Sequence, residues 1–457
     1  TSQRTPFEPF KMVILHNKLT IMLLIWISTE TNRTRYIFRL VIKDLLGIDF
    51  KVTTNIDEFK QFEGARLSYG KLAIEESIPH IQSADLLFLR GIDSLDFETS
   101  RFNEAPVIFK TYSKSSILPY DIFAASFFMV SRYEEYLPYR RDEHGRFSAK
   151  ESLAWSKGFL QLPIVNIWSL QLLSILKNLY PNLPFKTPDY KFEPTIDVDS
   201  AFAIRHKGML RSIGGYVKDI SAGDLHNMIY RTKVISGSLP DPFDVFDELH
   251  TLHQSFNLRP FYFILYGAYG MYDKNIPTNS EKFKRLIRWL ADTAEVGIHP
   301  SYASNRNPNI LKQEVDELSA VLHTSVIRSR QHFLKLELPL TYRNLINLDI
   351  EHDYTMGFAA APGFRAGITI PFKFYDLDLD APGTLTIHPF TLMDGTMKDY
   401  LKINDDEVVD YTTELIKTVR KYGGTFGLLW HNETFSETGR WKGWRDIYIR
   451  ILKEAAV

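Results

Sequence analysis

The chain contains no cysteine among its 457 residues, which excludes disulfide bonds, thiolate zinc sites and a cysteine nucleophile. It also lacks an excess of charge of one sign, because 54 Lys and Arg residues are balanced by 55 Asp and Glu residues, for a formal net charge of -1. This balance gives no general attraction to nucleic acid or to an anionic membrane. We therefore expect no nucleic-acid partner and a neutral or weakly charged substrate. Any metal must be held by His and carboxylate side chains.

Long hydrophobic runs are also missing. The most membrane-like segment, Leu19–Ile27, is far shorter than the roughly 20 apolar residues of a membrane-spanning helix, and it predicts a buried strand instead. The first ten residues lack the charged-then-apolar order of a secretory signal, although the chain begins with Thr1 rather than Met. Together with the absence of cysteine, these features lead us to expect no membrane span and a cytoplasmic location.

Three nucleotide and hydrolase motifs are absent. The sequence contains no G-x-x-x-x-G-K-[ST] phosphate loop, no dinucleotide-binding G-x-G-x-x-G and no G-x-S-x-G nucleophile elbow. Nucleotide hydrolysis and serine-esterase chemistry therefore lose support.

The composition, 44% hydrophobic and 24% charged, is that of a globular protein with enough apolar material for more than one core. Segments 120–136 and 162–179 have the apolar spacing of helices. A proline-rich connector follows them, and we place a domain boundary at residue 188. We expect a smaller α/β domain over residues 1–188 and, over 189–457, a domain close to the roughly 250 residues of a (β/α) barrel.

Within the second domain, apolar strand-like runs alternate with helical ones, as in an α/β fold. The predicted strands include 260–265, 296–299, 383–388 and 426–431, and the clearest helices are 281–295 and 309–323. Several strands end in a residue capable of chemistry, namely Asp197, His299, His388 and His431. Catalytic groups of α/β barrels lie at the carboxyl ends of strands, so we expect these side chains in one pocket.

Asp197 and Asp199 lie two residues apart at the end of a strand, so both carboxylates point to the same face. Like charges held this close resist joint ionisation unless a cation neutralises one of them. The pair thus predicts either an acid/base couple with split pKa values or a metal ligand beside a base; a solvated strand end is the plain alternative.

Four motifs in order, residues 195–199, 297–301, 363–367 and 428–431, resemble those of NodB-like polysaccharide deacetylases. The resemblance covers roughly residues 190–457, and the preceding part resembles the accessory domain of some bacterial members. It implies a distorted (β/α) barrel and a metal-dependent hydrolase that removes N- or O-linked acetyl groups from a polysaccharide or glycan precursor.

The resemblance also implies roles for individual residues. Asp197 would be the general base and His431 the general acid, while Asp199 and His299 would bind a divalent metal. Arg365 would pair with the charged form of Asp197. Zn²⁺ is the metal that we expect first, although His and carboxylate ligands also admit Co, Mn and Ni.

The third metal ligand departs from the family pattern. The family places a second His four residues after the first, but that position is Ala303 here. We expect His332 to replace it, because His332 follows a predicted strand over 325–328; a buried structural histidine is the alternative. Ser301, Ser304 and water could instead complete the shell.

Two other functions remain open from the sequence. Ala303 motivates a non-catalytic glycan-binding or scaffolding protein that keeps the barrel without a complete metal site. A metal-dependent amidase for a small molecule shares the chemistry but requires a closed pocket rather than an open groove.

Overall fold

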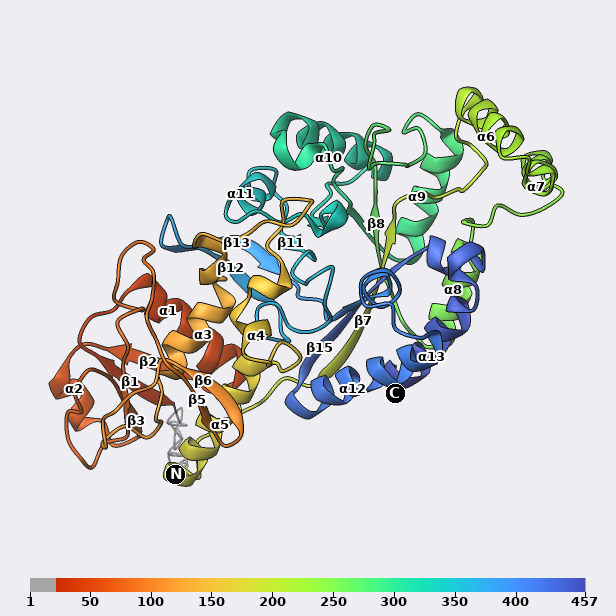
Figure 1. The fold of residues 1–457 in the computed structure, drawn as a ribbon. Helices are drawn as coiled ribbons and strands as arrows, with labels where there is room; N and C mark the ends of the chain where they lie inside the picture. The colour runs from red at the N-terminus through yellow and green to blue at the C-terminus, as the bar shows by residue number, and fades with distance from the viewer. Residues whose placement is uncertain (1–21, 457) are drawn as a thin grey trace, which may run out of the picture.

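The computed structural model describes residues 22–456. Within this range the chain forms a four-stranded sheet, a nine-stranded sheet and a short two-stranded sheet, with helices packed against them (Figure 1). The predicted mixed α/β class is confirmed. Of the expected strand 19–27, the structure contains β1 (Leu23–Ile27), while residues 19–21 and the first ten residues lie outside the described range.

The first sheet is parallel and has the order β2-β1-β3-β4. Its other strands are β2 (Phe50–Thr53), β3 (Ala65–Gly70) and β4 (His80–Gln82). Side chains of β1 alternate between faces, because Leu23, Ile25 and Ile27 join the main core while Leu24 packs with Phe59.

Helices cover both faces of this sheet. They are α1 (Asn32–Phe38), α2 (Ile56–Gln61), α3 (Ile122–Val130), α4 (Leu153–Ser156) and α5 (Ile164–Leu179), and β5 (Thr99–Phe102) pairs with β6 (Ala105–Ile108) nearby. Every residue of α3 is buried, so the predicted core helix is confirmed.

The second sheet has the order β12-β13-β11-β10-β9-β8-β7-β15-β14 and is parallel except for the β12–β13 pair. Its strands are β7 (Tyr190–Val198), β8 (Phe261–Ile264), β9 (Glu295–Ile298), β10 (Arg328–Ser329), β11 (His352–Asp353), β12 (Phe372–Asp376), β13 (Ala381–Ile387), β14 (Leu392–Met393) and β15 (Gly424–His431). The four predicted strands correspond to β8, β9, β13 and β15. No pairing joins β12 to β14 within residues 22–456, so the expected barrel closure is not confirmed.

Helices connect the strands of this sheet, and one further helix, α13, follows the last strand. They are α6 (Met209–Ser221), α7 (Leu225–Ser236), α8 (Phe246–Ser255), α9 (Glu281–Thr293), α10 (Pro308–Leu322), α11 (Leu340–Ile346), α12 (Asp405–Tyr422) and α13 (Trp444–Ala455). The two helices predicted from the sequence correspond to α9 and α10. Helix α10 begins where Asn307 accepts hydrogen bonds from two backbone N–H groups and Pro308 occupies the first turn. None of the helices in the described part of the chain is long and apolar enough to cross a membrane.

The two parts of the chain share one hydrophobic core, which contains Phe123 and Leu385 among its buried residues. A buried ion pair also joins them, since the Arg365 guanidinium lies 2.6 Å from the Glu135 carboxylate. The division at residue 188 stays a prediction. The site described next nevertheless draws on residues from both sides of it.

Candidate active site

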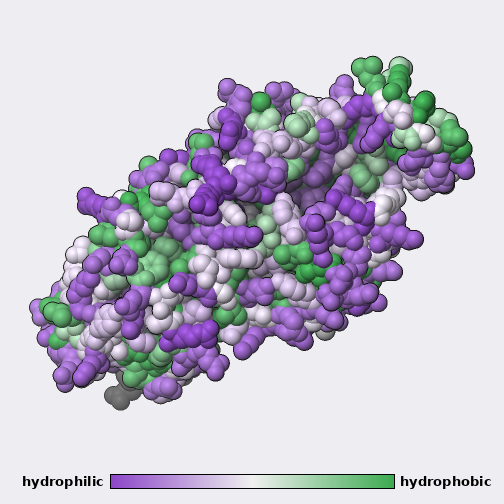
Figure 2. All heavy atoms as spheres, viewed as in Figure 1, coloured by the Kyte–Doolittle hydropathy of each residue, from purple (hydrophilic) through white to green (hydrophobic). Residues whose placement is uncertain are grey.

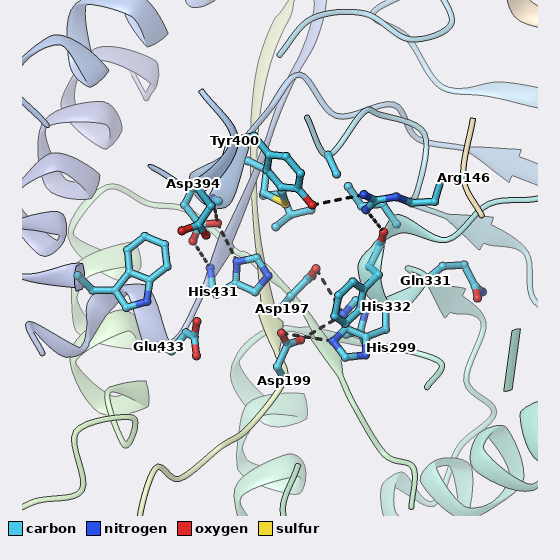
Figure 3. A pocket seen from close by; sticks show the side chains of 18 of the residues that line it. Arg146, Asp197, Asp199, His299, Gln331, His332, Asp394, Tyr400, His431 and Glu433 are labelled. Carbon is cyan, nitrogen blue, oxygen red and sulfur yellow. Dashed lines mark hydrogen bonds and ion pairs between the residues drawn. The ribbon is translucent and has the colours of Figure 1, made fainter. Parts of the chain in front are cut away.

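The candidate site lies where strands of the second sheet end. Strand β7 pairs in parallel with β15, with Asp197 opposite His431, so the ends of these strands meet at one edge. A pocket of about 190 Å³ opens at this edge (Figure 3). Its lining includes Asp197, Asp199, His299, His332, Asp394 and His431.

Asp199, His299 and His332 converge on one point. The His299 Nε2 atom lies 3.3 Å from Asp199 Oδ1, and His332 Nε2 lies 3.5 Å from Asp199 Oδ2. One ligand atom from each residue lies within 4.8 Å of the other two, so the three side chains can hold a metal ion. His332, the third ligand expected from the sequence, therefore lies close to Asp199 and His299.

The second ring nitrogen of each histidine is already engaged. His299 Nδ1 lies 2.6 Å from the carbonyl oxygen of Arg330, and His332 Nδ1 lies 2.8 Å from Asp273 Oδ1. Neither acceptor can donate a hydrogen, so both Nδ1 atoms carry the proton and both Nε2 atoms point at Asp199. Metal-binding histidines are commonly oriented in this way.

The surroundings of Asp199 suit a bound cation. Its Oδ1 atom is buried and accepts no hydrogen bond from any residue between 22 and 456, as expected for an oxygen that coordinates a cation. Burial raises the pKa of Asp199, but the adjacent His332 and His299 hold that pKa well below its usual range. Burial likewise lowers the pKa of His332, but Asp199 and Asp273 outweigh it and raise the pKa to about 9. The site therefore favours a positive charge beside the carboxylate.

The alternative ligands Ser301 and Ser304 do not line the pocket. The Ser301 amide donates to Glu314 at 3.0 Å, and the Ser304 amide donates to the Ser301 hydroxyl at 3.1 Å. Both serines therefore stabilise their own turn, and burial raises the pKa of the supporting Glu314 to about 7.

Asp197 is held by Arg330, which sequence reasoning missed. The buried Arg330 guanidinium donates to Asp197 Oδ1 at 2.8 Å and to the Thr195 hydroxyl at 2.7 Å, while its Nε donates to the Tyr354 carbonyl. The other carboxylate oxygen of Asp197 lies 3.7 Å from His299 Nε2 and therefore faces the three converging side chains.

The expected pairing of Arg365 with Asp197 is wrong. The Nε and one terminal nitrogen of the Arg365 guanidinium donate to the Glu135 carboxylate, at 2.9 and 2.6 Å, and the other terminal nitrogen donates to the Gly357 carbonyl. Arg365 lies in a loop packed against the N-terminal part of the chain, where the buried Glu135 needs a cation. Arg330 instead follows β10, which is separated from β7 by the two strands β9 and β8.

His431 forms a pair with Asp394, a second residue that sequence reasoning missed. His431 Nδ1 lies 2.8 Å from Asp394 Oδ1, and the Asp394 carboxylate also accepts hydrogen bonds from the His431 amide and the Thr434 hydroxyl. Burial lowers the pKa of His431, but Asp394 outweighs it and raises the pKa well above its usual value. Asp394 follows β14, whose two residues are too few to give a periodic signal.

His388 does not join these residues, although its position at the end of β13 predicted that it would. Its Nε2 lies 3.0 Å from His352 Nδ1 and its ring stacks on Tyr354 at a centroid distance of 4.3 Å. Burial lowers the pKa of His388 to about 3, so it is a neutral packing residue.

One wall of the pocket comes from the N-terminal part. The buried Arg146 donates to the Tyr400 hydroxyl at 3.3 Å (Figure 3). It also donates to the Phe333 carbonyl at 2.6 Å, and its Nε donates to Asp142 at 2.7 Å. His144 of the same turn packs against Phe333. This turn thus contacts the residue that follows His332 and supports the segment carrying it.

A family of unknown function (DUF7033) matches residues 23–181. The comparison with curated proteins gave no match.

Among solved structures, the chain is similar to a putative polysaccharide deacetylase from Mycobacterium smegmatis, at 14% identity over 59% of this chain and 85% of that chain, with a TM-score of 0.38. It is also similar to Puue allantoinase, at 12% identity over 58% and 84% of the two chains and a TM-score of 0.38. A probable polysaccharide deacetylase from Pseudomonas aeruginosa PAO1 gives 11% identity over 58% and 84%, with a TM-score of 0.37.

Proposed function

We propose that this protein is a metal-dependent hydrolase that removes acetyl groups from a carbohydrate. The observation that carries this proposal is the placement of three units in one pocket: the Asp199, His299 and His332 side chains, the Asp197–Arg330 pair and the His431–Asp394 pair. In Figure 3, His431 and Asp394 lie on one side of the two aspartates, and His299 and His332 lie on the other.

Asp199, His299 and His332 would hold a divalent ion, with Zn²⁺ the first candidate. Two imidazole nitrogens and one carboxylate oxygen suit this ion and leave further coordination positions open. When bound, it supplies Lewis acidity towards a carbonyl oxygen. The contacts of His299 and His332 with Arg330 and Asp273 fix both rings in advance of binding.

Asp197 acts as the general base. The charge-assisted hydrogen bond from Arg330 binds one oxygen of this carboxylate and fixes its rotamer. Because Arg330 occupies Oδ1, Oδ2 is the atom that takes a proton from an attacking water.

His431 acts as the general acid. Its Nδ1–H is bound by Asp394, so its Nε2–H is the proton available to a leaving alcohol or amine. The raised pKa keeps the imidazole protonated at neutral pH, as an acid requires.

The pocket lining suits a small acyl group next to a sugar. Ala359, Met393 and Leu429 provide an apolar surface for a methyl group. Tyr400 and Trp441 place aromatic rings at the same pocket, and such rings pack well against sugar faces. The proposal covers both N-acetyl and O-acetyl groups.

The non-catalytic alternative loses its motivation, because it depended on Ala303 leaving the metal site incomplete. His332 lies beside Asp199 and His299, so three ligand atoms are available without position 303.

The proposal is tested by metal analysis together with acetate release. We expect about one divalent ion per chain by mass spectrometry, its loss in Asp199→Ala and His299→Ala, and retention in His226→Ala, which changes an exposed histidine outside the site. Purified protein should release acetate from N-acetylated or O-acetylated oligosaccharides, and Asp197→Asn should abolish release while metal is retained. Absence of metal after incubation with zinc, or full acetate release by Asp197→Asn, would overturn the proposal.

A further inference from the structure

Helices α6 and α7 form a hairpin that extends away from the body of the protein (Figure 1). It follows strand β7, beginning ten residues after Asp199. Polar contacts hold the two helices together: Arg231 Nε lies 2.7 Å from Asp219, and the Tyr216 and Thr232 hydroxyls lie 2.9 Å apart.

The hairpin turns its apolar side chains outward. Helix α6 exposes 79% of Met209 and 86% of Leu210, and further exposed residues are Ile213, Val217 and Ile220 on α6 and Leu225, Ile229 and Ile235 on α7. At helical spacing the five residues of α6 fall within a stripe about 100° wide. Figure 2 shows the hydrophobic surface at this end of the molecule. A helix of a globular protein normally turns such a stripe to the core. Here the contact between the two helices instead contains the Asp219–Arg231 ion pair.

Basic residues surround this apolar surface. Residues 205–236 contain six Lys or Arg side chains and two acidic ones, in a chain whose formal net charge is -1. Asp219 is already paired with Arg231. Lys218 and Lys233 are exposed and make no ion pair with any residue of the described range 22–456. The excess positive charge of the hairpin is therefore available to an anionic partner.

We propose that the α6–α7 hairpin docks on the surface of an anionic lipid bilayer. Exposed aliphatic side chains flanked by cations are the features of helices that lie in the membrane interface, with the apolar stripe among acyl chains and the cations at the head groups. The helices have 13 and 12 residues, so they lie on the bilayer rather than span it.

A second copy of the chain is a poorer occupant of this surface. A two-fold interface would place the same patch on both subunits, so the unpaired cations of one hairpin would face those of the other. An anionic bilayer can contact both kinds of residue, because its acyl chains accommodate the apolar side chains and its head groups bind the basic ones.

The hairpin is anchored to the loop that supports the candidate site. The Arg211 guanidinium lies 4.4 Å over the Tyr269 ring and donates to the Asn275 carbonyl at 2.8 Å. Tyr269 and Met271 of this loop are themselves exposed, and Asp273 in the same loop is the partner of His332. Docking would therefore place the bilayer on the side of the protein where this loop supports the pocket. Docking itself does not require the protein to be an active enzyme.

The test uses vesicle binding by the full chain. We expect wild type to sediment with vesicles of phosphatidylcholine containing about 30 mol% phosphatidylglycerol, and Leu210→Glu/Ile213→Glu to reduce the bound fraction at least about tenfold. Lys218→Glu/Lys233→Glu should weaken binding to these vesicles and make it insensitive to salt. Leu72→Glu/Leu379→Glu, at two leucines that are 81% and 69% exposed elsewhere, is the matched control and should bind like wild type.

A fluorescence measurement reports insertion directly. Because the chain has no cysteine, Ile213→Cys gives a single labelling site for an environment-sensitive dye, with Leu72→Cys as the control. Docking is supported if anionic vesicles shift the dye emission of Ile213→Cys to the blue and leave the emission of Leu72→Cys unchanged. Wild type that stays in the supernatant, equal binding by Leu210→Glu/Ile213→Glu, or a lipid-independent dimer that this variant dissociates would overturn the proposal.

Discussion

Asp273 and His332 lie 59 residues apart in the chain and share a 2.8 Å hydrogen bond, from Nδ1 of the imidazole to Oδ1 of the carboxylate. Asp273 thereby fixes both the tautomer and the orientation of His332, so its Nε2 faces Asp199. A partner of this kind controls metal affinity without touching the metal itself.

Asp273→Asn should therefore weaken the binding of the divalent ion by roughly 10- to 100-fold, because a neutral amide oxygen holds the Nδ1–H group of His332 less strongly than the carboxylate does. The measurement is competition for zinc with a chromophoric chelator. Asp292→Asn, which changes an exposed aspartate of α9, is the matched control. Unchanged affinity in Asp273→Asn would show that His332 is not a ligand.

Substitutions of the two buried arginines should have different effects: loss of Arg330 should lower kcat, and loss of Arg365 should lower stability. Arg330→Met removes the partner of Asp197, so we expect kcat to fall by about 10²- to 10³-fold with a smaller change in KM. Arg365→Met leaves the buried Glu135 with Arg132 as its remaining cation, so the loss of the Arg365 hydrogen bonds should cost about 1–3 kcal/mol of unfolding free energy. The kcat of the folded fraction of Arg365→Met should remain near that of wild type.

Steady-state kinetics and thermal unfolding of both variants check this contrast. The sequence-based prediction was that Arg365 pairs with the proposed base, Asp197. It would regain support only if Arg365→Met had a lower kcat while the folded fraction of the protein stayed the same.

The His431–Asp394 pair predicts a pH dependence. Asp394 raises the pKa of His431 above its usual value against the effect of burial, so the protonated acid persists to higher pH. Activity that depends on this acid is present below the raised pKa and is lost as pH rises through it. Asp394→Asn lowers the pKa, so the alkaline limb of kcat/KM should move to lower pH, with kcat reduced by at least about tenfold.

The readout is a pH profile of kcat/KM for wild type and Asp394→Asn. Asp410→Asn, a change at an exposed aspartate of α12 that does not line the pocket, serves as the control and should leave the alkaline limb in place. An identical alkaline limb in wild type and Asp394→Asn would exclude His431 as the acid.

The sequence predicted the strand-end residues of the site better than their partners. Asp197 and His431 lie at the ends of β7 and β15 and His299 directly follows β9, and these strands are long enough to recognise. Parallel strands bring their ends together. Arg330 and Asp394 follow strands of two residues, β10 and β14, which carry no periodic signal. Their pairing depends on strand order, which one sequence does not reveal.

Closure of the sheet and the contacts of Arg365 illustrate the same limit. The alternation of strands and helices predicts an α/β fold, but the edge strands β12 and β14 are fixed by tertiary packing. Arg365 is flanked by two glycines, which the sequence shows, but its partner Glu135 comes from a segment 230 residues earlier.

Arg146 gives the sharpest prediction about the N-terminal part. Its guanidinium joins the Phe333 carbonyl to the Tyr400 hydroxyl at the pocket wall, so Arg146→Ala should let both move and impair substrate positioning. We expect KM to rise about tenfold with a smaller fall in kcat, because the Asp197 and His431 pairs are untouched. Arg140→Ala, at an exposed residue of the same segment, is the matched control. A kcat/KM of Arg146→Ala equal to that of Arg140→Ala would make the N-terminal part a support for the fold only. The expected rise in KM would instead show that Arg146 affects substrate binding. The region matched by DUF7033, which contains Arg146, would then form part of the substrate pocket.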